Sequence, residues 1–143
     1  MAFFKTGFKK IPKHQMSNSK HIDLKTVRLN YKIWLSDQED NGILGDGKWQ
    51  ILKTVEETGS LMAACKKMGL TYRRTWGDLK KIEQMLGFVL LEKSRGGAEG
   101  GASQLSPKGK KLVAAFDEFH KNVDSTINKA FEIFKHKLSE LSK

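Results

Sequence analysis

The residues of this sequence best suited to specific recognition chemistry are two adjacent arginines, Arg73 and Arg74, preceded by Thr71 and Tyr72. A guanidinium group can donate two parallel hydrogen bonds to O6 and N7 of guanine, and it can also bind phosphate. Threonine and tyrosine hydroxyls add hydrogen bonds to base edges or phosphates. This cluster therefore indicates a surface that contacts nucleic acid, provided that a rigid element presents it.

Two short helices joined by a tight turn are predicted over residues 59–91 and would present the cluster. Ser60 can cap the first helix with its hydroxyl, Gly69 provides the turn, and Thr71 caps the second helix. A helix pair of this kind is the layout of a DNA-reading helix-turn-helix, in which the second helix enters the major groove.

The second helix is predicted to be amphipathic, with one buried stripe that fixes its orientation. The stripe recurs at spacings of four, three and four residues, as one helix face requires. Its members are Thr75, Leu79, Ile82 and Leu86, with Trp76 at its edge. Tyr72, Arg73 and Arg74 are then left near the outward N-terminal end, where the positive end of the helix dipole also favours phosphate. We expect Arg73 and Tyr72 to read base edges, and Thr71 and Arg74 to anchor phosphates.

A glycine-rich hairpin is predicted after the second helix. Residues 88–91 and 103–106 form short extended segments with four glycines between them, but no nucleotide-binding motif is present. Lys93 and Arg95 would place positive charge at the base of this hairpin, where they could anchor phosphates. Glu99 at the tip would repel phosphate, so a plain hairpin without DNA contact is the alternative.

These features together resemble the N-terminal domain of ModE-type molybdate-responsive transcription regulators, whose winged helix is similar to that of LysR-type regulators. The resemblance covers roughly residues 24–120. The motifs that carry it are Gly59-Ser60, Ala63-Ala64, Leu70-Thr71-Tyr72-Arg73, Trp76, Leu91-Glu92-Lys93 and the glycine-rich segment from Arg95 to Leu112. Gly77 and Ala98-Glu99 depart from the family pattern, which bears on base specificity more than on the fold.

The resemblance implies a winged helix-turn-helix that binds double-stranded DNA. Full-length ModE regulators continue into molybdate-binding domains, for which residues 1–143 contain no counterpart. We therefore expect no direct molybdate site, and no oxyanion-binding residue is assigned.

Charge is concentrated near the start of the chain. The net charge is +10, and the five lysines of residues 1–22, where no acid occurs, supply half of it. Such a basic chain favours polyanionic partners. We expect residues 1–22 to form a disordered tail; an arm that follows DNA and an organellar presequence are the alternatives.

A strand, two turns and a further helix are predicted before the helix pair. Alternating apolar residues from Val27 to Leu35 favour a strand that joins the hairpin as a third strand. Turns are predicted at residues 40–42 and 45–47, and a supporting helix over residues 48–58. Trp49 is expected in the core, on one helix face with Leu52 and Val55.

A long helix is predicted after Ser106-Pro107, because a capping hydroxyl precedes a proline at the first helical position. Its apolar positions keep a spacing of three or four over some thirty residues. They are Leu112, Phe116, Phe119, Val123, Ile127, Ala130, Phe134, Leu138 and Leu141, with Lys137 beside Leu138. One small domain cannot cover this seam, so pairing with a second copy is expected. The alternative is that this helix packs against the predicted strand of the same chain, where Trp34 and Tyr31 would contact its apolar residues.

No catalytic, cofactor or metal site is predicted. The four histidines lie in two distant pairs without metal-ligand spacing, and we expect solvated helix histidines. Cys65 is the single cysteine, which excludes an intrachain disulfide and favours a small buried side chain. The apolar runs are too short to span a membrane, and a cytoplasmic location is expected.

The expected fold is mainly α with a small β-sheet: a basic tail (1–22), a winged helix-turn-helix domain (23–106) and a long C-terminal dimerisation helix (107–143). The expected function is that of a sequence-specific transcription regulator that binds double-stranded DNA as a homodimer. A winged-helix protein-interaction adaptor and a nonspecific nucleic-acid binder driven by the basic tail are the alternatives.

Overall fold

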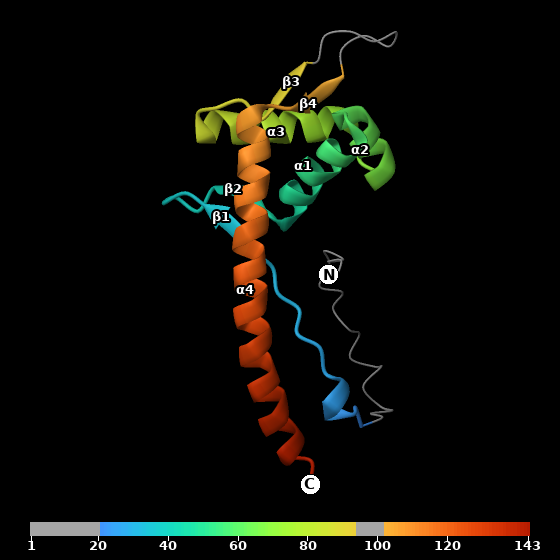
Figure 1. Cartoon of the computed structure of the whole chain (residues 1–143), viewed down its shortest axis with the longest axis vertical. Helices are drawn as coiled ribbons and strands as arrows, with labels where there is room; N and C mark the ends of the chain where they lie inside the picture. Colours follow the sequence, from blue (N-terminus) through green and yellow to red (C-terminus); the bar gives the residue numbers. More distant parts are fainter. Residues whose placement is uncertain (1–20, 94–101) are drawn as a thin grey trace. The chain divides into compact units, whose positions relative to one another are not determined.

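The computed structural model describes residues 21–93 and 102–143 (Figure 1). The elements in order are the 3₁₀ helix η2 (Leu24–Thr26), β1 (Trp34–Ser36), β2 (Gly42–Gly45), α1 (Asp46–Thr58), α2 (Leu61–Met68), α3 (Tyr72–Leu86), β3 (Leu91–Lys93), β4 (Ser103–Leu105) and α4 (Pro107–Glu140). The chain divides into two compact units. One consists of residues 33–121, and the described part of the other consists of residues 21–32 and 122–143.

The helix-turn-helix forms as predicted, because glycine and serine define its boundaries. Gly59 ends α1 and Gly69 ends α2, both with a positive φ (86° and 66°) that glycine adopts without steric cost. The Ser60 hydroxyl accepts a hydrogen bond from the backbone N–H of Ala63 (3.1 Å), which caps α2. Thr71 occupies the N-cap position of α3, but its hydroxyl makes no capping hydrogen bond, so that part of the prediction was wrong.

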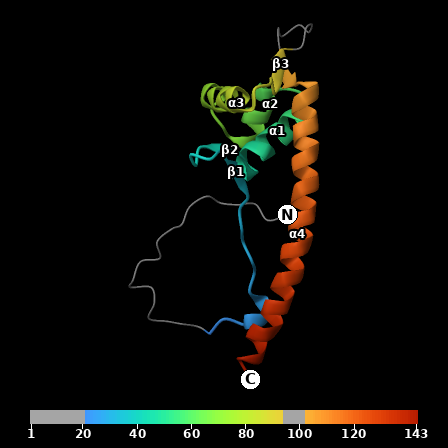
Figure 2. The same ribbon diagram turned by 90° about the vertical axis from the view of Figure 1, so that its left-hand side faces the viewer.

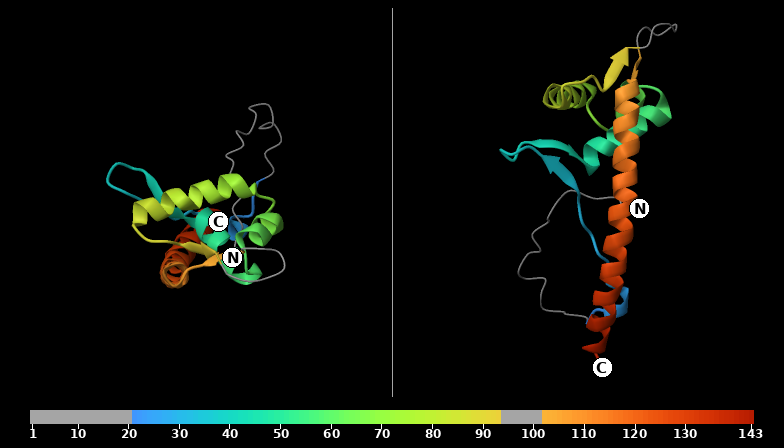
Figure 3. Two further views of the ribbon diagram at one scale, coloured as in Figure 1. Left: turned by 90° about the horizontal axis from the view of Figure 1, so that it is seen from above. Right: turned by 60° about the vertical axis from the view of Figure 1, so that its left-hand side comes forward.

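The core of the unit formed by residues 33–121 confirms the predicted helix faces. In α1, Trp49, Ile51, Leu52 and Val55 are buried, and in α3, Thr75, Leu79 and Ile82 are buried while Leu86 is half-buried. Cys65 is buried as a free thiol. Figure 2 shows α1 and α2 between α3 and the first part of α4. These three elements therefore lie on the same side of α3, as the view from above in Figure 3 also shows.

Two separate antiparallel hairpins flank α3 (Figures 1 and 2). In the second, β3 pairs with β4, with Leu91 opposite Leu105 and Lys93 opposite Ser103, as predicted for the glycine-rich hairpin, which is the wing of the domain. The first pairs β1 with β2. The predicted strand from Val27 to Leu35 was wrong: only residues 34–36 are extended in a ladder, and they do not join the wing.

The start of α1 explains a second wrong prediction, the turn at residues 45–47. Gly45 ends β2, and α1 already begins at Asp46. A carboxylate oxygen of Asp46 accepts the backbone N–H of Ile33 (3.1 Å), and the Asp46 N–H donates to the carbonyl of Ile33 (3.1 Å). These two hydrogen bonds hold the start of α1 against Ile33, just before β1. The chain therefore passes from β2 directly into α1 without a separate turn.

Helix α4 begins at Pro107 as predicted, because the Ser106 hydroxyl accepts the backbone N–H of Gly109 (2.9 Å). Its first part packs on α1 through Trp49, whose indole N–H donates to Asp117 (2.8 Å). The imidazole of His120 stacks on the Trp49 ring, with 4.3 Å between ring centroids, and Nε2 lies 2.6 Å from Asp46 Oδ1. His120 is buried, so its prediction as a solvated histidine was wrong.

In the other unit, residues 21–32 run beside the second part of α4 (Figures 1 and 3). Along that part of α4, Val123, Ile127, Phe131 and Leu138 are half-buried. Ile133, Phe134 and Leu141 stay exposed, at 62%, 56% and 83%. The chain's own segment therefore covers only part of the predicted seam. No helix within residues 21–93 and 102–143 is long and apolar enough to cross a membrane.

Candidate nucleic-acid interface

The N-terminal end of α3 presents the side chains that the sequence singled out. Thr71, Arg73 and Arg74 are exposed, and Tyr72 is half-buried. Thr71 precedes the first helical turn, which the two arginines and Tyr72 then occupy. Donors at a helix N-terminus are well placed to bind the negatively charged edge and backbone of a duplex.

Tyr72 is oriented by Trp76, one turn further along α3. The two rings stack with 6.2 Å between centroids and an interplanar angle of 16°. Tyr72 and Trp76 also pack against the edge of the core. The phenol is thus held by ring packing, while the neighbouring Arg73 side chain extends into solvent.

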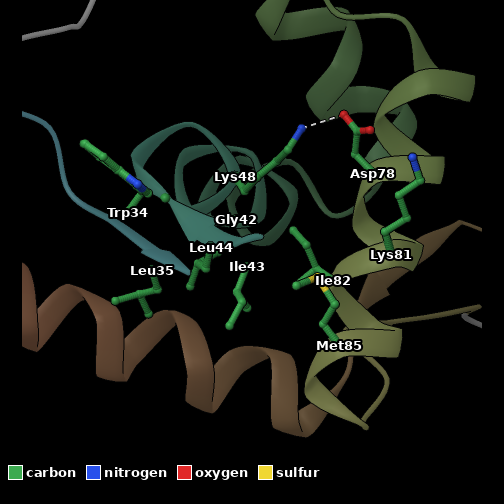
Figure 4. Close-up of a pocket in the computed structure, with 11 residues that line it drawn as sticks. Trp34, Leu35, Gly42, Ile43, Leu44, Lys48, Asp78, Lys81, Ile82 and Met85 are labelled. Atoms are coloured by element: carbon green, nitrogen blue, oxygen red, sulfur yellow. Dashed lines mark hydrogen bonds and ion pairs between the residues drawn. The ribbon is translucent and has the colours of Figure 1, made fainter. Parts of the chain in front are cut away.

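The acids of α3 are held in ion pairs, which leaves a positive surface at its start. Lys48 of α1 donates to Asp78 at 2.7 Å (Figure 4). This hydrogen bond is the main cause that holds the pKa of Asp78 below its usual value, and the charges of Arg74 and Lys81 add to it. Asp78 therefore stays ionised and offsets part of the positive potential near Arg74, one turn away.

A shallow apolar groove of about 350 Å³ lies between the β1–β2 hairpin and the middle of α3 (Figure 4). Its lining includes Trp34, Leu35, Ile43, Ile82 and Met85. None of Thr71, Tyr72, Arg73 and Arg74 lines it, so the groove and the start of α3 are distinct surfaces.

The wing places one predicted contact residue at its base. Lys93, the last residue of β3, is exposed and pairs in register with Ser103 of β4. Arg95 and Glu99, with the glycines around them, lie outside the described residues.

Glu83 is a functional candidate that the sequence did not reveal. Its Oε1 accepts the backbone N–H groups of Leu90 (2.8 Å) and Leu91 (3.0 Å), and its Oε2 binds the Lys80 ammonium (2.8 Å). Burial alone would raise the pKa of Glu83, but Lys80 and the two N–H donors together hold it below its usual value. From the sequence this residue would be taken for a solvated acid on a helix, because its partners are backbone N–H groups beyond the end of α3, which residue spacing does not indicate.

The described residues contain no group of three or more His, Cys, Asp or Glu side chains arranged to hold a metal ion. His120 is buried, and its imidazole, which contacts the half-buried Asp46, packs against Trp49 and Phe116 in the core. We assign this pair a packing role between α1 and α4.

Three helices followed by an antiparallel hairpin, with exposed arginines on the third helix, define a winged helix-turn-helix domain. Residues 47–110 match the family described as bacterial regulatory helix-turn-helix protein, lysR family. This segment is therefore similar to the helix-turn-helix of LysR-family regulators, as the sequence indicated.

Several ModE-type proteins are similar to the chain. The molybdenum-pterin-binding protein MopB of Rhodobacter capsulatus is 32% identical over 73 residues, which are 51% of this chain and 27% of that protein. The dual regulator ModE of Escherichia coli is 28% identical over 47% of this chain and 26% of its own length. The molybdenum transport protein ModE of Azotobacter vinelandii is 25% identical over 67% and 36%, respectively.

The solved structure of ArgP from Mycobacterium tuberculosis matches 58% of this chain and 29% of its own, with 19% identity and a TM-score of 0.44.

The predicted resemblance to ModE-type regulators is confirmed over about half of the chain. The chain spans about a quarter to a third of the length of these curated relatives.

Proposed function

We propose that this protein is a transcription regulator that binds double-stranded DNA sequence-specifically as a homodimer. The observation that carries the proposal is the exposed pair Arg73 and Arg74 on the first turn of α3, within a helix-turn-helix segment that matches the LysR family. Second helices of such domains enter the major groove and contact base edges with their N-terminal residues. The relatives match this chain over only a part of their length, so the proposal assigns DNA binding to it and no oxyanion site.

The proposed contacts follow from exposure and chemistry. Arg73 and Tyr72 read base edges, with the Tyr72 ring oriented by its stack on Trp76. Thr71 and Arg74 anchor phosphates beside the groove. Lys93, together with Arg95 outside the described residues, anchors phosphates at the wing. Arg73 is the strongest candidate for base reading, because Asp78 partly offsets the charge of Arg74.

We expect Arg73→Ala to lower discrimination between a cognate duplex and a scrambled duplex by about tenfold, since a bidentate arginine–guanine contact is worth about 1 to 3 kcal/mol. The cognate duplex would be selected from random sequence with the wild-type protein, and affinities would be measured by fluorescence anisotropy at fixed salt. Arg74→Ala is the matched control: loss of a phosphate contact should weaken both duplexes alike. An unchanged affinity ratio in Arg73→Ala would overturn the assignment.

Dimerisation is supported by the second part of α4. Ile133, Phe134 and Leu141 remain exposed although residues 21–32 already lie beside this part of the helix. We propose that the same face of α4 in a second copy packs on these residues, because symmetric pairing buries the apolar face of both copies. A homodimer would also place two copies of α3 on half-sites about one duplex turn, roughly 34 Å, apart.

We expect Phe134→Glu to weaken the dimer by at least about tenfold, since a two-fold interface buries the introduced charge twice. Sedimentation equilibrium over a range of protein concentrations measures the effect. Ser125→Glu adds the same charge at an exposed position of α4 away from Ile133 and Phe134, and should leave the dimer unchanged. A wild-type protein that sediments as a monomer would refute homodimerisation, and equal dimer constants in both variants would refute this face.

A further inference from the structure

We infer that Glu83 is a positioning residue for DNA binding, which ties the wing to α3 so that Lys93 is held where it can bind a phosphate. This inference rests on the proposed DNA-binding function. It concerns a residue that does not itself face the duplex, because the side chain of Glu83 is only 10% exposed.

The Glu83 carboxylate ties the start of the wing to α3. One carboxylate oxygen of Glu83 accepts two consecutive backbone N–H groups, those of Leu90 (2.8 Å) and Leu91 (3.0 Å). Leu91 is the first residue of β3, and both leucines are buried. Hydrogen bonds to a charged, poorly exposed acceptor are stronger than those between neutral groups. The start of the wing is thus bound to a side chain of α3.

The same segment is also held by the serine that precedes α4. The Ser106 hydroxyl donates to the carbonyl of Val89 (2.5 Å), and the Ser106 N–H donates to the carbonyl of Leu90 (2.8 Å). Residues 89–91 are therefore anchored to two helices at once. Of these two anchors, Glu83 is the one that comes from the helix bearing Arg73.

A row of side-chain contacts connects Glu83 to the start of α3. Tyr72 stacks on Trp76, the Lys80 ammonium lies 4.4 Å from the centre of the Trp76 ring, and Lys80 binds Glu83 at 2.8 Å. Spacings of four, four and three residues put these side chains on one face of α3. This row runs from the proposed base-reading end to the base of the wing, and Lys80 neutralises Glu83, so the tie adds no uncompensated negative charge near DNA.

The test separates the reach of the Glu83 side chain from its charge. Glu83→Asp keeps the charge but withdraws the carboxylate from the two N–H groups, whereas Glu83→Gln keeps an acceptor oxygen at full reach. We expect Glu83→Asp to lower cognate affinity about fivefold and to reduce the salt slope by about one, as loss of a single phosphate contact does. Glu83→Gln should keep most of the wild-type slope.

A double-mutant cycle with Lys93→Ala provides the decisive readout. If Glu83 acts by positioning Lys93, the variant with both Glu83→Asp and Lys93→Ala should be no weaker than Lys93→Ala alone. Multiplicative losses, or a salt slope unchanged in Glu83→Asp, would overturn the inference. Thermal unfolding of each variant would show that the compared proteins are folded. Failure of the proposed function is distinguishable, because the wild-type protein would then show no preference between cognate and scrambled duplexes.

Discussion

Replacement of Trp49 by alanine is expected to lower the free energy of unfolding by about 3 to 5 kcal/mol, the usual cost of removing a large buried aromatic side chain. Trp49 is 3% exposed and joins α1 to α4. Its ring stacks on His120, meets Phe116 edge-on with 5.6 Å between centroids, and donates its N–H to Asp117. The substitution removes these contacts together and leaves a cavity between the two helices.

The chain supplies its own control for this experiment. Trp34 is 65% exposed, so Trp34→Ala should change the free energy of unfolding by less than about 0.5 kcal/mol, as for other surface substitutions. Both variants would be unfolded with urea and followed by far-UV circular dichroism at one protein concentration, because dimerisation would make stability depend on concentration. Equal losses in the two variants would contradict the packing of α4 on α1.

A substitution at Gly109 is expected to have the second largest effect. A Cβ added there would lie 2.5 Å from the carbonyl oxygen of Leu90, which belongs to the backbone and has little freedom to move. Gly109→Ala should therefore force the start of α4 away from the wing base and cost about 1 to 3 kcal/mol, the range for overpacking. The same shift would lengthen the bonds from Ser106 to residues 89 and 90.

Gly77 provides the matched control, since it is a helical glycine whose added Cβ would meet no atom within 4 Å. Gly77→Ala should leave stability unchanged or raise it by about 0.5 to 1 kcal/mol, because alanine has the higher helix propensity. Thermal and urea unfolding of both variants measure the difference. A Gly109→Ala protein as stable as wild type would mean that the wing base and α4 do not approach this closely.

The same contacts connect stability to the proposed function. Gly109 allows α4 to approach Leu90, and Glu83 holds the N–H of Leu90 from the opposite helix. Both residues act on a three-residue segment that leads into β3. A small change there would move Lys93 relative to Arg73 without touching either side chain.

The helix-turn-helix could be predicted from the sequence, because its signals are local. Ser60, Gly59 and Gly69 set the helix ends through a hydroxyl cap and positive φ angles, and the buried stripe of α3 follows from spacing alone. The exposure of Arg73 and Arg74 follows from the same spacing. The start of α4 at Pro107 was likewise predicted from a capping serine followed by proline.

Features that depend on residues distant in the chain could not be predicted from local signals. The alternation from Val27 to Leu35 predicted a strand, but an apolar pattern does not show which segment will pack on it. Only residues 34–36 pair with another strand. His120 reads as an exposed helix residue until Asp46, 74 positions earlier, and Trp49 are brought against it. Glu83 likewise gained its role from the backbone of Leu90 and Leu91. Periodicity and capping report on neighbours within a few residues, whereas burial and side-chain hydrogen bonding are set by whichever segments the fold brings together.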